Sequence, residues 1–107
     1  MKRGDLVTVA LQGDLGKPRP ALVIQTELIL NHPTIVVLPL TSAVIAAPLL
    51  RVTVEPTPES GLRSVSQIMV DKPIAVQRRR LGDVIGHIDE TTMGRVTKTL
   101  AMWLGIA

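Results

Sequence analysis

The chain has 107 residues, 46% of them hydrophobic, which predicts a single domain over residues 1–107 and excludes two-domain enzymes. Cysteine is absent and only two histidines occur, which excludes disulfides, thiol nucleophiles, zinc–thiolate sites and all-histidine zinc sites. We expect no cofactor. Twelve Lys and Arg residues against nine Asp and Glu give a net charge of +3, which favours an anionic partner.

The first two thirds of the sequence have the residue pattern of β-strands separated by turns. Val, Leu and Thr dominate residues 5–12 and 19–26, and the loop of residues 13–18 separates these two expected strands. Residues 34–40 are almost continuously apolar, which is typical of a strand buried on both faces. Further strands are expected over residues 50–55, which alternate apolar and polar positions, and over residues 64–70, 74–77 and 81–88.

The end of the chain has the period of an amphipathic helix. Asp89 is expected to cap its start and Gly105 to end it. Its apolar residues recur at spacings of three and four, and we expect them on one buried face: Met93, Val96, Leu100, Trp103 and Leu104. Gly94 within the helix indicates a close contact or a frayed first turn. Many short strands and one closing helix predict a mainly β fold, a strongly bent sheet or a partly open barrel.

No segment is predicted to enter a membrane. The most apolar window, residues 43–50, is far shorter than the ~20 residues that a spanning helix needs. Polar residues interrupt any signal-peptide core near the N-terminus. We therefore expect a cytoplasmic protein without a membrane partner.

Five short segments follow one another in order along the chain. They are GDLVTV from residue 4, GKPRPALVI from residue 16, VLPLTS from residue 37, SQIMVDK from residue 66, and the final LGI. In this order they resemble the MazF/PemK/Kid family of toxin endoribonucleases from bacterial toxin–antitoxin pairs, over essentially the whole chain. The resemblance implies a small SH3-like barrel of the CcdB and MazF type with a C-terminal helix, assembled as a homodimer.

The resemblance also implies an activity and its partners. The protein would cleave single-stranded RNA, including mRNA, at specific sequences without a metal. The products would be a 2′,3′-cyclic phosphate and a 5′-hydroxyl. A cognate antitoxin protein would occupy the RNA groove, and operator DNA would be contacted only through the antitoxin complex.

Arg19 and Thr41 are the expected catalytic residues. Pro18 and Pro20 hold Arg19 in an extended conformation, and its guanidinium can donate two hydrogen bonds to a phosphate. The family carries its catalytic arginine at this position, whereas a surface ion pair is the alternative. Thr41 follows a buried strand and matches the family hydroxyl that assists at the scissile phosphate; the alternative is a hydroxyl that caps a turn with Ser42.

Four further residues are expected to bind RNA: Lys17, Ser42, Gln67 and Arg79. Lys17 lies on the loop that closes over the site in the family, or is a solvated loop residue. Gln67 matches a groove glutamine whose amide can read a base edge, or is a polar residue on an exposed strand face. Arg79 belongs to the densest charge in the chain, Arg78–Arg80, which forms either a rim for RNA or antitoxin or a solvated turn.

Two positions depart from the family pattern. Met69 stands where many members have Arg or Lys, so the second cation of the site is missing or comes from elsewhere, for which Asp71 and Lys72 are neighbouring candidates. The general base is open, because the first loop has Asp14 and Leu15 where some relatives have a histidine. His32 and His87 are not expected to take part.

Two other functions stay open beside RNA cleavage. A CcdB-like toxin of the same fold poisons gyrase and uses a C-terminal Trp-Gly-Ile, which resembles the ending from Trp103 to Ile106. Leu104 interrupts that ending, and Trp103 is expected on the apolar face of the helix, which argues against it. A catalytically inactive relative is the other alternative, and Met69 favours it.

Overall fold

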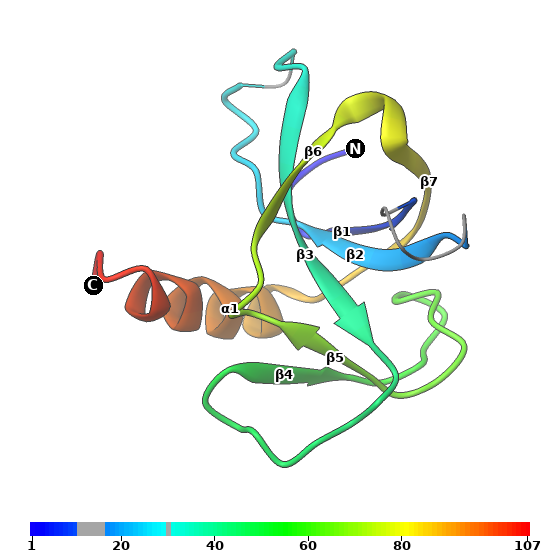
Figure 1. Cartoon of the computed structure of the whole chain (residues 1–107). Helices are drawn as coiled ribbons and strands as arrows, with labels where there is room; N and C mark the ends of the chain where they lie inside the picture. Colours follow the sequence, from blue (N-terminus) through cyan, green and yellow to red (C-terminus); the bar gives the residue numbers. More distant parts are fainter. Residues whose placement is uncertain (11–16, 30) are drawn as a thin grey trace.

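A computed structural model describes residues 1–10, 17–29 and 31–107 of the chain, which form a strongly bent antiparallel sheet with one α-helix at the end (Figure 1). Residues 11–12 of the first expected strand and residues 13–16 of the following loop, including Asp14 and Leu15, lie outside the described residues. The elements in chain order are β1 (Asp5–Val9), β2 (Arg19–Val23), β3 (Thr34–Thr41), β4 (Arg51–Val54), β5 (Ser66–Met69), β6 (Ile74–Gln77), the 3-10 helix η1 (Arg78–Arg80), β7 (Leu81–His87) and α1 (Glu90–Trp103).

The strand pairing centres on β3. The order of the sheet is β4-β5-β3-β2-β1-β7, and β6 pairs with β3 as well. The first half of β3, Thr34–Val37, pairs with β6, and its end, Leu40–Thr41, pairs with β5. No pairing joins β4 to β7 within the described ranges, so this sheet is not closed. The mainly β antiparallel fold is thus confirmed, whereas the small barrel that the resemblance implies is not.

Both faces of the central strands are buried. Successive residues of a strand point to opposite faces of the sheet, so Leu6 and Val7 of β1 belong to two different hydrophobic clusters. The cluster with Leu6 includes Leu22, Leu38, Ile68 and Val96, and the helix α1 packs against it. The cluster with Val7 contains Val9, Ala21, Val23, Ile35, Val37 and Val76. The expectation of a doubly buried third strand is confirmed.

The predicted strands agree with the observed ones apart from their ends. The alternation predicted for residues 50–55 is present, because Val52 and Val54 are buried while Thr53 and Glu55 are exposed. The second strand ends at Val23 rather than at residue 26, although the backbone N–H of Ile24 still donates to Val36 O at 3.1 Å. These differences do not alter which side chains face the interior.

The helix begins and ends where the sequence predicts. Asp89 precedes it and accepts a hydrogen bond from the backbone N–H of Thr92 at 2.6 Å. At the other end Gly105 has a φ of 75°, and the backbone N–H of Ile106 donates to Ala101 O at 2.9 Å, which is the Schellman closure. Among the described residues, no helix is long and apolar enough to cross a membrane.

The predicted burial of the last helical turn is wrong. Val96 is buried, and Met93 and Leu100 pack against the core, but Trp103 is 49% exposed and Leu104 is 53% exposed. The helix is longer than the surface it covers, and its C-terminal end projects away from the strands (Figure 1). Of the two explanations that the sequence offers for Gly94, the close contact is not found, since a Cβ there would meet nothing within 4 Å.

Candidate functional site

An open groove of about 810 Å³ lies where the start of β2, the end of β3 and the connection between β4 and β5 come together. Figure 1 shows that β2 begins on the same side of the molecule as this connection. The residues that line the groove are Thr8, Pro18, Arg19, Pro20, Pro39, Leu40, Thr41, Ser42, Gly61, Leu62, Arg63, Ser64, Ser66, Met69 and Ile85. Three of the six residues predicted for the site, Arg19, Thr41 and Ser42, are therefore brought together.

Arg19 is the first residue of β2 and is exposed in the groove. The flanking prolines line the groove beside it. Proline fixes its own φ and disfavours a helical conformation at the residue before it, so the backbone of Arg19 is held extended, as the register with Val9 of β1 requires. The local sequence thus presents the guanidinium to the groove from a restricted backbone.

Thr41 ends β3 and lines the groove together with Ser42. Its Oγ1 accepts a hydrogen bond from the backbone N–H of Ala43 at 3.1 Å. A hydroxyl has one proton to donate in addition to its acceptor lone pairs, so the bond with Ala43 leaves that proton available to a ligand. The turn role and the groove role that the sequence offered as alternatives are compatible in this geometry.

Gln67 does not lie among the groove residues. It is 4% exposed and stands opposite Thr41 in the pairing of β3 with β5. Its Nε2 donates to Ile45 O at 2.8 Å, and its Oε1 accepts from Ile45 N at 3.0 Å. The amide therefore holds the segment that follows Ser42, and this bonding makes Gln67 a support of the groove wall.

Arg63 and Ser64 line the groove although the sequence reading did not select them. They follow Gly61 in the connection between β4 and β5, which the sequence identified only as a turn. Gly61 and Gly86 allow this connection to touch β7 closely, because a Cβ at Gly61 would lie 1.9 Å from Ile85 O. The two glycines are the only sign of this close contact in the sequence, and the sequence does not indicate that their two segments lie against each other.

The charged side chains described in the groove are all positive. Among its lining residues within the described chain, the ionisable side chains are Arg19 and Arg63, and no carboxylate is present. Four hydroxyl side chains add neutral hydrogen-bonding groups, Thr8, Thr41, Ser42 and Ser64, whereas the buried hydroxyl of Ser66 donates to Ser64 O at 3.0 Å. Two guanidinium groups with hydroxyls around them suit a ligand with phosphate oxygens.

The other expected cations lie outside this lining. Lys17 is exposed and immediately precedes the groove residue Pro18. Arg79 is exposed in η1, and its Nε donates to Gln77 Oε1 at 2.7 Å. Lys72 pairs with Asp71 at 3.6 Å, and neither residue lines the groove. Met69 lines the groove, and its side chain carries no charge.

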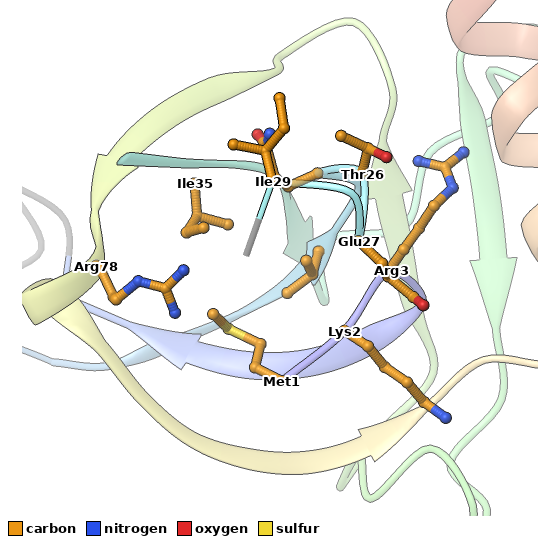
Figure 2. A pocket seen from close by; sticks show the side chains of 10 residues that line it. Met1, Lys2, Arg3, Thr26, Glu27, Ile29, Ile35 and Arg78 are labelled. Carbon is orange, nitrogen blue, oxygen red and sulfur yellow. The ribbon is translucent and has the colours of Figure 1, made fainter. Parts of the chain in front are cut away.

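A second hollow lies at the N-terminus, away from these residues. Figure 2 shows the side chains of Met1 and Arg78 on one part of its rim and those of Thr26 and Ile29 on another. Its volume is about 10 Å³, roughly the space of one water molecule. It therefore cannot hold a ligand of the size that the groove admits.

The histidines do not form a site. His32 is exposed, and its Nδ1 accepts from the backbone N–H of Thr34 at 3.1 Å. His87 ends β7 opposite Asp5. Within the part of the chain that the structure describes, no three His, Cys, Asp or Glu side chains are placed to share a metal ion.

Comparison with known proteins agrees with the fold and the groove described above. A family model described as PemK-like, MazF-like toxin of type II toxin–antitoxin system matches residues 2–104. The probable endoribonuclease MazF of Mycolicibacterium smegmatis is 44% identical over 108 residues, which cover 100% of this chain and 99% of the relative.

Solved structures share the fold at lower identity. An endoribonuclease from a mycobacterial species, in complex with its cognate antitoxin, has a TM-score of 0.82 at 21% identity and covers 100% of this chain and 97% of that chain. A MazE–MazF complex from Deinococcus radiodurans has a TM-score of 0.81 at 23% identity, with coverages of 100% and 97%. These two likenesses establish the arrangement of the strands and helix.

Proposed function

The chain belongs to the family of PemK-like, MazF-like toxins of type II toxin–antitoxin systems, and on this premise we propose that it is an endoribonuclease that cleaves single-stranded RNA in the groove at Arg19. The observation that carries the proposal is the meeting of Arg19, Thr41 and Ser42 in one groove, whose ionisable lining residues in the described part of the chain are arginines. A polyanion fits such a groove, and the 44% identity to a probable endoribonuclease supports RNA as that polyanion.

The cleavage chemistry follows from the side chains available. The ribose 2′-hydroxyl attacks the adjacent phosphorus and loses its proton, while the 5′-oxygen of the next nucleotide leaves and takes up a proton. The products are a 2′,3′-cyclic phosphate and a 5′-hydroxyl, and no metal takes part. Negative charge grows on the phosphoryl oxygens in the transition state, where donors already in position are most effective.

Arg19 and Thr41 supply these donors. The guanidinium of Arg19 can donate two parallel hydrogen bonds to phosphoryl oxygens, and it remains charged while doing so. The Thr41 hydroxyl, which accepts from Ala43 N, donates its proton to the same phosphoryl group. Ser42, exposed in the wall of the groove, binds the RNA beside the scissile bond.

The remaining cations bind RNA outside the cleavage point. Lys17 adjoins the groove and holds a neighbouring phosphate, and Arg79 attracts the strand further along. Gln67 acts through the wall that carries Thr41 and Ser42, since its amide is occupied by Ile45. Because Trp103 is the single aromatic residue of the chain, the groove reads RNA by hydrogen bonds and phosphate contacts instead of aromatic stacking.

The proposal includes the partners and the setting of such a toxin. A cognate antitoxin neutralises the protein by occupying the cationic groove, for which an acidic segment is chemically suited. The protein is a homodimer of single-domain chains spanning residues 1–107, in a small barrel of the MazF type, and it acts in the cytoplasm. Operator DNA is bound only through the antitoxin complex.

Cleavage of a long RNA in the presence of EDTA tests this function. The purified protein should cut at specific sequences and leave 5′-hydroxyl ends, whereas Arg19→Ala should lose at least about a hundredfold in rate. Arg95→Ala is the matched control, because Arg95 is an exposed arginine of α1 outside the groove. A wild-type protein that leaves RNA intact in this assay is not an endoribonuclease. Trapped gyrase–DNA complexes would then support the CcdB-like alternative, for which the exposed Trp103 provides a contact.

A further inference from the structure

A second arginine lines the groove on a different element from Arg19. Arg63 belongs to the connection between β4 and β5, and its side chain is exposed to the groove. No ion pair joins Arg63 to a carboxylate among the residues that the structure describes. We propose that Arg63 is the second phosphate-binding residue of the groove and holds a phosphate of the RNA next to the one held by Arg19. This proposal rests on the proposed function, because it assumes RNA as the ligand.

The connection that carries Arg63 is held in place by Ser60. Ser60 is 3% exposed, and its Oγ donates to Glu55 O at 2.9 Å. The same Oγ accepts from Thr57 N at 3.0 Å and from Leu62 N at 3.3 Å. One buried hydroxyl thus ties together both ends of the turn that leads to Arg63. A backbone held in this way positions a side chain before the ligand binds, which reduces the entropy lost on binding.

Contacts with β7 fix the same segment against the sheet. The backbone N–H of His87 donates to Glu59 O at 2.8 Å. Gly61 has a φ of +66°, and a Cβ there would meet Ile85 O at 1.9 Å. Ile85 itself lines the groove. The turn is therefore a fixed part of the groove wall, and Arg63 leaves it two residues after Gly61.

A second cation in the groove suits an RNA strand that lies along it. A single-stranded RNA carries one negative charge per nucleotide, so a strand in the groove presents successive phosphates to its walls. Met69 contributes no charge to the wall, and the lining residues that the structure describes include no carboxylate that would neutralise Arg63. Lys17 adjoins the groove at Pro18 without lining it, so among the described lining residues Arg63 is the cation besides Arg19 that can receive a phosphate.

Salt-dependent RNA binding separates a phosphate contact from a general charge effect. The probe is a mixed-sequence 2′-O-methyl oligoribonucleotide, which cannot be cleaved because its 2′-hydroxyls are blocked. Arg63→Ala should bind it roughly five- to tenfold more weakly than the wild type at physiological salt. The slope of log affinity against log salt should become shallower by about 0.7, the value for one phosphate contact on a single strand. Arg95→Ala changes the net charge equally and should keep the wild-type slope.

Restoring a cation at another point of the same wall provides the second test. Met69 lines the groove, so Met69→Arg in the Arg63→Ala background should recover the salt slope and most of the affinity. Arg63→Lys should retain the slope, because an ammonium keeps the charge although it loses the paired hydrogen bonds.

The outcomes distinguish this proposal from the proposed function. An Arg63→Ala protein with the affinity, salt slope and cleavage rate of Arg95→Ala overturns the role of Arg63, while cleavage by the wild type and its loss in Arg19→Ala would still support the nuclease. If the wild-type protein neither cleaves RNA nor binds the probe, both proposals fail together. Thermal unfolding of each variant shows whether it is folded.

Discussion

The side-chain amide of Gln67 forms two hydrogen bonds with the backbone of Ile45, donating to its carbonyl at 2.8 Å and accepting from its N–H at 3.0 Å. This pair joins β5 to the segment that leaves the groove after Ser42. Thr41 stands opposite Gln67 in the sheet, so a single residue supports the wall on two sides. Buried glutamine is uncommon unless its amide is satisfied, and here the backbone of Ile45 satisfies it.

The Gln67→Met variant should weaken this wall without leaving a large cavity. Methionine has a similar length but cannot replace the two hydrogen bonds, so the free energy of unfolding should fall by about 1–2 kcal/mol. The amide proton of Ile45 should exchange faster, and kcat for RNA cleavage should fall roughly tenfold because Thr41 and Ser42 are held less firmly. Hydrogen exchange and cleavage kinetics measure these effects.

Gln77→Met is the control for this change. Gln77 is an exposed amide at the end of β6, outside the groove, and its Oε1 accepts from Arg79 Nε, so the control is judged on kcat and not on RNA affinity. It should leave kcat and the exchange of Ile45 unchanged. If Gln67→Met lowers only the affinity for RNA and leaves Ile45 protected, Gln67 contacts the RNA directly instead of supporting the wall.

The parts of the site that depend on adjacent residues were predictable from the sequence. The two prolines beside Arg19 determine its backbone conformation, and the end of an apolar strand determines where Thr41 lies. Arg63 was not predictable, because its placement depends on the contact of Gly61 with Ile85, far away in the sequence. Trp103 shows the same limit, since helical periodicity gives the face on which a residue lies but not how far the sheet beneath it extends.

Two glycines with opposite surroundings give opposite stability predictions. Gly61→Ala places a Cβ at a φ of +66° and 1.9 Å from Ile85 O, so the free energy of unfolding should fall by at least about 2 kcal/mol. Displacement of Arg63 should also weaken RNA binding. Gly94→Ala adds a Cβ that meets nothing within 4 Å, and within a helix it should raise stability by about 0.5–1 kcal/mol. Urea unfolding compares the two, and equal effects would contradict the close approach at Gly61.

The cap of α1 should make stability depend on pH in the acid range. Hydrogen bonds from the Thr92 side chain and then from the Thr92 backbone N–H lower the pKa of Asp89 below its ordinary value of 3.8. Because the folded state favours the carboxylate, its stabilising contribution is present above pH 3.8 and is lost as the pH falls through the lowered pKa. Asp89→Asn keeps a capping side chain but does not titrate.

The difference in melting temperature between wild type and Asp89→Asn measures this contribution. The advantage of the wild type should be constant near neutral pH and should shrink below pH 3.8. An advantage that does not change with pH would show that the charge of Asp89 does not matter to the cap.

Thr41 offers the most direct test of whether a turn residue also takes part in chemistry. Its Oγ1 accepts from Ala43 N at 3.1 Å while the side chain lines the groove. Thr41→Val has nearly the same shape and removes the hydroxyl, so it should lose about 1 kcal/mol of stability with the Ala43 bond. It should also lower kcat by ten- to a hundredfold, because the phosphoryl oxygens lose one donor in the transition state.

Thr41→Ser is the matched control, because it removes the methyl group and keeps the hydroxyl. Serine keeps the acceptor for Ala43 and the proton for the phosphate, so kcat should stay within about threefold of the wild type. Cleavage of one RNA by the three proteins, beside their urea unfolding curves, gives both quantities. If Thr41→Val is destabilised but cleaves at the wild-type rate, the hydroxyl serves the turn alone, and the charge of the transition state is then stabilised by the arginines of the groove.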